Sequence, residues 1–317
     1  MEQVPSQSFQ KRSQRWLQTS LPFWLIFPTL LIMFAIQVYP FLYTIWLSLE
    51  QRQPEGWLFV GFKNFTQLFA SSLFKESIGL TIVFLVIFVV ITLVCGFGIA
   101  FLLSRDIRFT GLYTTLLFIP WVLSDIIGGE VFRLLVLPSY GVLSPILQNP
   151  QLFPPDGISV LTASPPTPWI GNFPFPPSPA LVLLIIATAW RALPFVTLLL
   201  LASIQMIPRE VIESARIDGA NGLQVIGYIM LPIMRPTLVV VLFSLILNGM
   251  NGVGMIFSLT RGGPGTQTQI MPWLLYSIGW LQVNFNWAAA MALVVGVINL
   301  LLIVGTLRVT KLEDVDA

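Results

Sequence analysis

Two asparagines, Asn248 and Asn251, lie three positions apart in a mainly apolar stretch of the chain. Residues at this spacing share one face of a helix. Their amides donate and accept hydrogen bonds, which suits the hydroxyl groups of a neutral solute, and burying them without partners is costly. We therefore expect Asn248 and Asn251 to contact a polar solute. The neighbouring Gly249, Gly252 and Gly254 also permit close helix packing or a local break, which is the structural alternative for this stretch.

Other residues are weaker candidates for contact with such a solute, because binding sites combine hydrogen-bonding groups with aromatic faces. Trp190 and Asn299 each lie within another apolar segment, and each equally fits an interhelical hydrogen bond or an interface filler. The weakest candidates lie before or at the start of the last apolar segment: Tyr276, Trp280, Gln282 and Trp287.

Two charged residues lie deep inside apolar segments. Asp125 and Arg191 lie sixteen and fifteen residues from the same-side ends of their segments. At ~1.5 Å per residue they reach about the same depth, and an unpaired charge there is expensive. We therefore expect Asp125 and Arg191 to form an ion pair. Glu130 is the alternative partner, because Pro120 and Pro194 are expected to bend the two helices, and Arg191 could instead bind a solute oxygen.

The composition excludes several kinds of chemistry. The chain has no histidine and one cysteine, Cys95, so neither a metal site nor a disulfide framework is expected. None of its four lysines follows a glycine, so the phosphate-binding Walker sequence is absent and we do not expect an enzyme. A net charge of +2 with scattered basic residues makes a nucleic acid an unexpected partner.

These polar residues stand out because the rest of the chain is suited to a lipid bilayer. Hydrophobic residues make up 56% of it and charged residues 9%, too few to cover a soluble domain of 317 residues. A spanning helix needs about 20 mainly apolar residues. We predict an all-α, polytopic membrane protein with six transmembrane helices, at about residues 21–49, 77–104, 110–132, 180–205, 237–259 and 287–307.

Basic residues indicate the orientation, because positively charged loops resist translocation. Ten lie on one side of the predicted spans and four on the other, which places the tails 1–20 and 308–317 in the cytoplasm with loop 206–236. The ten are Lys11, Arg12, Arg15, Arg105, Arg108, Arg209, Arg216, Arg235, Arg308 and Lys311, and the four are Arg52, Lys63, Lys75 and Arg261. The outer loop 138–178 contains eleven prolines, so we expect extended, turn-rich backbone that is either a spacer or a docking surface.

The residue types in loop 206–236 indicate its local structure. Pro208 suits the first turn of a helix, and good helix formers follow it. Gly219 stands where a left-handed cap would end this helix, and Asn221-Gly222 supplies a second turn. We predict a short amphipathic helix, a sharp turn and a second helix, a form that suits a membrane surface or a groove on another protein.

This loop also carries a spaced motif: Glu213-Ser214-Ala215, three residues, Gly219, nine residues, Ile229, one residue and Leu231-Pro232. The motif resembles the EAA motif of ABC importer permeases and departs from it at Ser214, where the family usually has alanine. The resemblance implies a coupling helix, which docks into a cleft on a separate ATPase subunit. The implied docking residues are Glu213, Ser214, Ala215, Arg216, Asp218 and Gly219. The alternative, a plain solvated loop, explains the polarity but not the spacing.

Further segments resemble the carbohydrate-importer branch of that family: WRALPFVTLLLLASIQMIPRE, LTRGGP at 259–264 and NWAAAMAL at the start of the last span. LTRGGP and the apolar N-terminal segment LPFWLIFPTLLIMFAIQVYPFLYTIWLSL resemble the maltose-type first permease, the F subunit. The resemblance implies the type I ABC importer permease fold in a bacterial inner membrane. It also implies a second permease in a heterodimer, two ATPase subunits that bind ATP and Mg, and an extracytoplasmic solute-binding protein. The fifth span resembles the solute-contacting span of the maltose permease, which favours Asn251.

The implied function is import of a sugar or sugar-like solute by alternating access, such as a trehalose- or maltose-type disaccharide or a glucosylglycerol-type glycoside. Polyol and glycerol-phosphate importers share most of these features, although the absence of a cationic cluster in the spans favours a neutral solute. The alternative is an ion-coupled secondary transporter or channel without an ATPase partner, which would normally show an internal repeat and ionisable relay residues.

Overall fold

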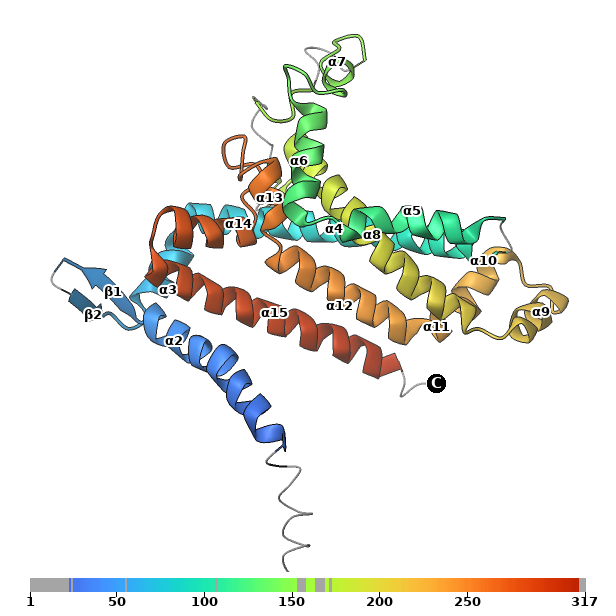
Figure 1. The fold of residues 1–317 in the computed structure, drawn as a ribbon, viewed down its shortest axis with the longest axis horizontal. Coiled ribbons are helices and arrows are strands. Elements are labelled where there is room, and N and C mark those ends of the chain that lie inside the picture. The colour runs from blue at the N-terminus through green and yellow to red at the C-terminus, as the bar shows by residue number, and fades with distance from the viewer. Residues whose placement is uncertain are drawn as a thin grey trace, which may run out of the picture.

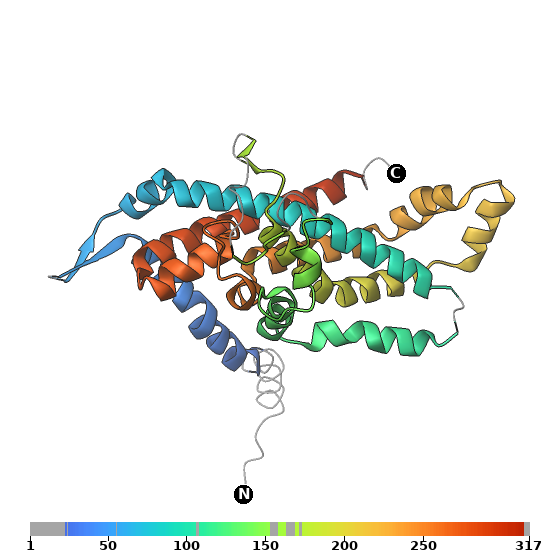
Figure 2. The ribbon, with the colours of Figure 1, turned by 90° about the horizontal axis from the view of Figure 1, so that it is seen from above.

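The computed structural model of the chain is mainly helical and describes residues 23, 25–54, 56–105, 108–152, 158–162, 169–170 and 173–313. The long helices that form its body are α4 (Ser72–Leu103), α8 (Pro179–Gln205), α12 (Arg235–Asn251) and α15 (Phe285–Glu313) (Figure 1). Seen from above, α5 (Thr110–Val122) extends toward the same end of the molecule as α4 (Figure 2). The helical class predicted from the sequence is therefore confirmed.

The core lies mainly between α4 and α8. Phe84 and Phe88 of α4 are buried and stack with ring centroids 5.6 Å apart, and Leu200 of α8 is buried in the same cluster. A Cβ at Gly96 would lie 2.7 Å from Val196, so this glycine lets the two helices approach closely. The opposite face of α4 keeps large apolar side chains exposed, as expected for a helix that faces lipid.

The predicted spans correspond to single helices or to bent pairs. Four helices are long and apolar enough to cross a bilayer: Leu25–Ser48, Ser72–Leu103, Pro179–Gln205 and Phe285–Arg308. Two bent pairs, Thr110–Val122 with Asp125–Val136 and Gly222–Ile233 with Arg235–Asn251, bring the total to six if each pair is one span. The tail 1–20 lies outside the described residues, and the tail predicted from 308 continues α15 as helix to Glu313.

The predicted span 110–132 is not one helix. α5 ends at Val122, α6 covers Asp125–Val136, and their axes differ by 97°. Pro120, which was expected to bend this span, lies inside α5 and not at the break. The prediction of a continuous helix is therefore wrong, and α6 rises away from the long helices (Figure 1).

The break has a local and a tertiary cause. Leu123 and Ser124 have extended backbone, and the Ser124 hydroxyl caps α6 by accepting a hydrogen bond from the N–H of Ile127 at 3.3 Å. The Leu123 carbonyl accepts a hydrogen bond from Nε of Arg191 on α8, 3.0 Å away. The same Nε lies 2.9 Å from Oδ1 of Asp125, the first residue of α6. Arg191 thus holds both sides of the break from a neighbouring helix.

The contact between Asp125 and Arg191 is the ion pair expected from their depth. Their side chains are 36% and 22% exposed, so water screens the pair only in part. The alternative partner, Glu130, instead lies 3.6 Å from Arg133 on its own helix. Asp125 is also in the first turn of α6, where the helix dipole favours a negative charge.

The predicted span 237–259 is interrupted as well. α12 is followed by Gly252 in extended conformation and then by α13 (Gly254–Leu259). A Cβ at Gly254 would lie 2.6 Å from Cβ of Asp125, so this glycine lets α13 pack closely on α6. The prediction of one helix to 259 is therefore wrong, and the structural alternative for the glycines, a local break with close packing, is present here.

The two ends of the bundle carry different small elements (Figure 1). One end carries the antiparallel strands β1 (Glu50–Gln53) and β2 (Gly56–Phe59), with α3 (Lys63–Ala70), α14 (Met271–Tyr276) and the π-helix η3 (Ser277–Leu281). The opposite end carries α9 (Arg209–Ile217), α10 (Gly222–Val225), the π-helix η2 (Ile226–Met230) and α11 (Leu231–Ile233). The described parts of loop 138–178 contain α7 (Ser144–Leu147) and the short strands β3 (Trp169–Ile170) and β4 (Phe173–Pro174).

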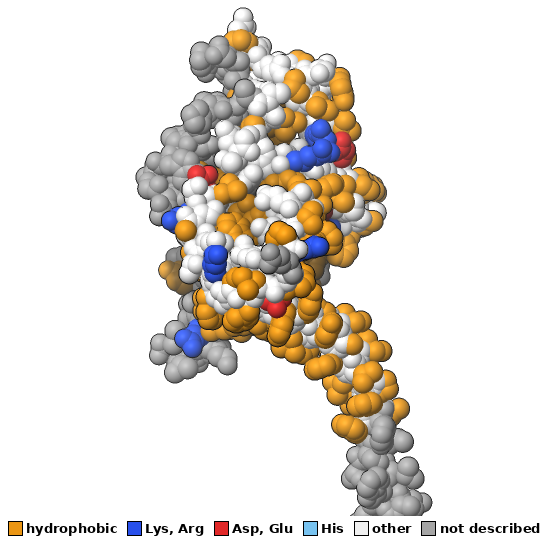
Figure 3. All heavy atoms as spheres, turned by 90° about the vertical axis from the view of Figure 1, so that its left-hand side faces the viewer, with side chains coloured by type: hydrophobic (Ala, Val, Ile, Leu, Met, Phe, Trp, Pro, Cys, Tyr) orange, Lys and Arg blue, Asp and Glu red, His pale blue; other side chains and the backbone are white. Residues whose placement is uncertain are grey.

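The first helical segment, Leu25–Ser48, projects from the body of the molecule (Figure 1). It contains the π-helix η1 (Phe34–Val38) and α2 (Tyr39–Ser48), and none of its apolar window is buried. Apolar side chains cover its visible surface (Figure 3). Its last turn is held to α15 by Asn286, whose Nδ2 donates a hydrogen bond to the Leu47 carbonyl at 3.0 Å.

Removing either member of the Asp125–Arg191 pair is expected to lower the stability of the protein. Asp125→Asn removes the opposite charge, and Arg191→Met leaves the Leu123 carbonyl without its donor. A hydrogen bond to a charged group contributes about 2 kcal/mol, so thermal unfolding of the purified protein should begin several degrees lower in each variant. The double reversal, Asp125→Arg with Arg191→Asp, should recover part of the loss, because a carboxylate at position 191 cannot donate to Leu123.

Glu130→Gln is the matched control for this experiment. It removes a carboxylate from the same helix, but from a more exposed and longer ion pair, so the melting temperature should change little. Equal shifts for Glu130→Gln and Asp125→Asn, or no recovery in the double reversal, would show that the Asp125–Arg191 pair does not hold the break.

Candidate functional site

The loop 206–236 turns at a glycine whose backbone conformation other residues rarely adopt. Gly219 follows α9 with φ of +88°. Its N–H donates a hydrogen bond to the Arg216 carbonyl at 3.1 Å, and the N–H of Ala220 donates to the Ala215 carbonyl at 2.9 Å. These bonds satisfy carbonyl groups that the end of a helix leaves free. The left-handed cap predicted at Gly219 is present.

The second helix of the loop begins with a reciprocal cap. Oδ1 of Asn221 accepts a hydrogen bond from the N–H of Gln224 at 2.9 Å, and Oε1 of Gln224 accepts one from the N–H of Asn221 at 2.8 Å. This capping box sets the direction in which the chain enters α10. The predicted helix, turn and helix are thus observed, except that Pro208 precedes α9 as its cap residue and does not lie in its first turn.

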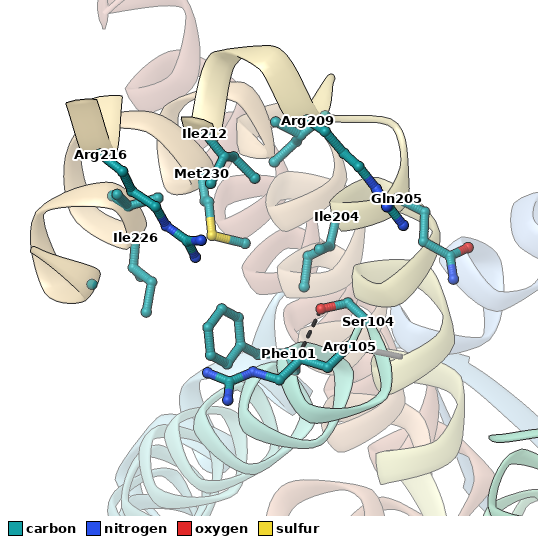
Figure 4. A pocket seen from close by; sticks show the side chains of 13 residues that line it. Phe101, Ser104, Arg105, Ile204, Gln205, Arg209, Ile212, Arg216, Ile226 and Met230 are labelled. Carbon is teal, nitrogen blue, oxygen red and sulfur yellow. Dashed lines mark hydrogen bonds between the residues drawn. The ribbon is translucent and has the colours of Figure 1, made fainter. Parts of the chain in front are cut away.

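The tip of this loop lies at the end of the bundle (Figure 1). Five of the six residues implied for docking are exposed, namely Glu213, Ser214, Arg216, Asp218 and Gly219, and Ala215 is half-buried against the core. The guanidinium of Arg216 points into a cavity between the loop and the long helices (Figure 4). Arg216 is therefore placed differently from the rest of the implied docking residues.

Large apolar side chains on the loop were missed as candidate site residues. Ile217 is 87% exposed and Leu223 is 82% exposed, on either side of the Gly219 turn. Exposed apolar groups of this kind mark interaction sites when they lie together. The helical period could have identified Ile217, because at about 100° per residue it lies on a different face from Ile212 and Ala215, which pack inward.

A second group of polar residues gathers at the breaks in the third and fifth spans. Asn248, Asp125 and Thr188 line a cavity of about 10 Å³, which has room for one water molecule at most. Through Asp125 this cavity adjoins the ion pair with Arg191. Asn248 is otherwise exposed, so a solute larger than water would contact it from outside this cavity.

The structure also brings together two predicted solute contacts. Asn299 of α15 donates from Nδ2 to Oδ1 of Asn251 on α12, at 3.4 Å. Nδ2 of Asn251 donates to the Leu247 carbonyl of its own helix at 2.8 Å. Asn251 is exposed, and Oδ1 of Asn299 is buried without a hydrogen-bond partner among the described residues. Asn299 Oδ1 thus retains unused hydrogen-bonding capacity, but its burial closes it to a solute in this conformation.

The aromatic candidates are engaged mainly in packing. The Trp190 ring meets Phe132 edge-on at 5.4 Å, and no hydrogen bond to the asparagines is found among the described residues. The remaining candidates near η3 have the following partners: Tyr276 packs on Phe257 and Trp273, Trp280 packs on Phe285, and Nε1 of Trp287 donates to Oε1 of Gln67. Gln282 is exposed at the end of η3. These residues do not form one site with Asn251 in the structure.

The chain is similar in sequence and in fold to known transport proteins. Residues 94–311 match the family described as binding-protein-dependent transport system inner membrane component. The trehalose/maltose transport system permease protein MalF of Thermococcus litoralis is 30% identical over 271 residues, which cover 84% of this chain and 86% of that protein.

Two solved structures share the fold. One is a bacterial ABC transporter involved in the import of the acidic polysaccharide alginate, with a TM-score of 0.76 and 22% identity over 95% of this chain and 98% of that one. The other is a bacterial alginate ABC transporter in complex with an alginate pentasaccharide-bound periplasmic protein, with a TM-score of 0.73 and 21% identity over 92% and 94%. The fold is thus the type I ABC importer permease fold. The chain belongs to the family of inner membrane components of binding-protein-dependent transport systems, and it is an ABC transporter permease.

Proposed function

We propose that the chain is one membrane subunit of an ATP-driven importer and that the tip of its loop 206–236 docks on a separate ATPase. The observation that carries this proposal is the exposure of Ile217 and Leu223 beside the Gly219 turn, at 87% and 82%. Apolar side chains gain free energy when a partner removes them from water. The exposed carboxylates of Glu213 and Asp218 add polar contacts around them.

The proposed ATPase supplies the chemistry that this chain does not contain. None of its four lysines follows a glycine, as a Walker phosphate-binding loop requires. ATP and Mg are therefore assigned to two ATPase subunits, and the permease transmits their closure to its spans. An ion-coupled secondary transporter remains the alternative function, and it would leave the exposed tip without a partner.

A second permease is the proposed partner within the membrane. The segment Leu25–Ser48 is mainly apolar and is exposed over its N-terminal part, while its last turns pack on α15. In a heterodimer it can pack against the spans of the other subunit. An extracytoplasmic solute-binding protein is proposed to deliver the solute, because a solved structure of the same fold is in complex with a solute-bound periplasmic protein.

The proposed solute is a neutral sugar or sugar-like compound, such as a trehalose- or maltose-type disaccharide or a glucosylglycerol-type glycoside. Asn251 and Asn299 offer amides, which suit hydroxyl groups. Arg191 already pairs with Asp125, so this cation is not free to bind an acidic solute. The permease of Thermococcus litoralis, named for trehalose and maltose, supports this class.

The proposed location is a bacterial inner membrane with both termini in the cytoplasm. The end of the bundle that carries α9 also carries Arg105 and Arg108, in agreement with the ten-to-four bias of basic residues along the sequence. This orientation places the coupling tip on the side where ATP is available.

Gly219→Pro should abolish docking of the ATPase, because proline fixes φ near −65° and lacks the N–H that bonds to Arg216. The tagged chain, expressed with its partners, is recovered from gently solubilised membranes and the bound proteins are identified by mass spectrometry. We expect a loss of the P-loop ATPase of about tenfold or more, while the second permease stays bound.

Gly222→Ala is the matched control in the same loop, because a Cβ there meets no atom within 4 Å. It should recover the ATPase as the wild type does. Equal recovery of ATPase with Gly219→Pro would place docking elsewhere. A wild-type chain that comes out alone or as a homo-oligomer would favour the secondary transporter.

Asn251→Ala should slow uptake of radiolabelled trehalose or maltose by cells that express the complete complex. Loss of one hydrogen bond to a solute hydroxyl corresponds to about a tenfold lower uptake rate at equal protein amount. Ser244→Ala is the control on the same helix, since that hydroxyl bonds to the Val240 carbonyl of its own helix. Equal rates for both variants would remove Asn251 from the solute site, and no uptake of either sugar by the wild type would contradict the solute class.

A further inference from the structure

A cavity of about 610 Å³ lies between the inner loop and the ends of α4 and α8 (Figure 4). Much of its wall is apolar and includes Phe101, Ile204, Ile226 and Met230. The wall is built from segments that are far apart in the sequence, so the loop 206–236 forms one side of it and the long helices form the other. Ile217 and Leu223, which carry the proposed docking of the ATPase, do not line this cavity.

Three arginines also line this cavity. Arg105 lies just after α4, and Arg209 and Arg216 lie at the two ends of α9. Figure 4 shows their side chains around the same space, and the Arg105 guanidinium lies 4.9 Å from the centroid of the Phe101 ring, which orients it. Within the described part of the chain, none of the three forms an ion pair and no carboxylate lines the cavity.

A second cavity of about 700 Å³ continues this positively charged region. It shares Arg105 and Arg209 with the first cavity and adds Arg108. Four guanidinium groups thus line two cavities whose described lining residues include no carboxylate. Such a cluster is repulsive by itself, so an anion that enters it is bound favourably.

The cavity lies at the level of lipid headgroups. α8 has 27 residues and therefore extends about 40 Å, which is close to the thickness of a bilayer with its headgroup layers. Ile204 and Gln205, in the last turn of α8, line the cavity. An occupant at this depth meets water on one side and hydrocarbon on the other.

We propose that this cavity binds the phosphate group of an anionic phospholipid. Arg105, Arg209 and Arg216 contact the phosphate oxygens, because the planar guanidinium group matches phosphate geometry. The apolar wall contacts the lipid's glycerol and upper acyl carbons. The proposal requires only that the chain lies in a bilayer, and it holds whether or not the tip of the loop docks on an ATPase.

The same phosphate chemistry could come from a soluble ion, but the wall favours a lipid. A free phosphate ion gains nothing from Phe101, Ile204 or Met230, whereas a lipid buries part of its apolar surface there. A carboxylate of the ATPase is disfavoured for a different reason. The Arg216 guanidinium points into the cavity toward the long helices, and not outward at the tip where that partner would approach (Figure 4).

Native mass spectrometry of the full chain in detergent tests the proposal. The protein is incubated with phosphatidylglycerol or with phosphatidylcholine of the same acyl chains, and bound lipid is counted. We expect preferential retention of phosphatidylglycerol by the wild type. Each of Arg105→Gln, Arg209→Gln and Arg216→Gln should lower that preference about fivefold, and the triple variant should lose it.

Two further variants control for folding and for general charge. The triple variant Arg105→Lys, Arg209→Lys and Arg216→Lys keeps the charges and should retain most of the preference. The triple variant Arg52→Gln, Arg261→Gln and Arg308→Gln removes the same charge from exposed positions outside the cavity and should behave as the wild type. Incubation with inorganic phosphate forms a separate arm and should displace phosphatidylglycerol only weakly.

Three results would overturn the proposal. Retention of the lipid preference in the cavity triple variant, or its loss in the control triple variant, would show nonspecific attraction. Displacement by low concentrations of inorganic phosphate, with no preference between the two lipids, would identify a site for a soluble anion. An unchanged lipid preference of the cavity triple variant, combined with loss of the ATPase when that variant is recovered from membranes with its partners, would assign the arginines to the ATPase.

Discussion

Breaking a helix inside a bilayer frees backbone groups that lipid cannot hydrogen-bond, and each unsatisfied group costs several kcal/mol. The third span meets this constraint through Arg191, which donates to the Leu123 carbonyl before the break and pairs with Asp125 after it. α8 can carry this side chain because it stays helical from Pro179 to Gln205 and is buried against α4. The direction of α6, and with it the position of α13, therefore depends on one guanidinium group.

The polar residues of the spans divide into two groups with different bonding. Asp125 and Arg191 are joined at 2.9 Å and are occupied by structure. Asn251 and Asn299 are joined only at 3.4 Å, a distance at which a hydrogen bond is weak. A weak bond between two amides is easily exchanged for bonds to a hydroxyl group, whereas the ion pair would have to be broken at a high cost. The ion pair and the proposed solute contacts thus differ in how readily their bonds can be exchanged.

Local features of the fold and one tertiary contact, the Asp125–Arg191 pair, were predictable, whereas the other tertiary features were not. Gly219 and Asn221 are residue types that suit a helix end and a turn, so their positions could be predicted. The equal depth of Asp125 and Arg191 in their spans was enough to predict their pairing. The break at Ser124 escaped prediction because Pro120 is the stronger local signal, yet its helix continues through it. The bond between Asn251 and Asn299 joins residues 48 positions apart, and Arg216 lines a cavity whose opposite wall comes from α4 and α8; neither is encoded in local spacing.

The projecting segment Leu25–Ser48 has a consequence for how the protein is made. In lipid it is stable as an isolated helix, because all its backbone bonds are internal. It can therefore enter the bilayer as a helix before its last turns pack on α15. Its N-terminal part is exposed along its whole length, so in a bilayer this part must be covered by lipid or by another protein.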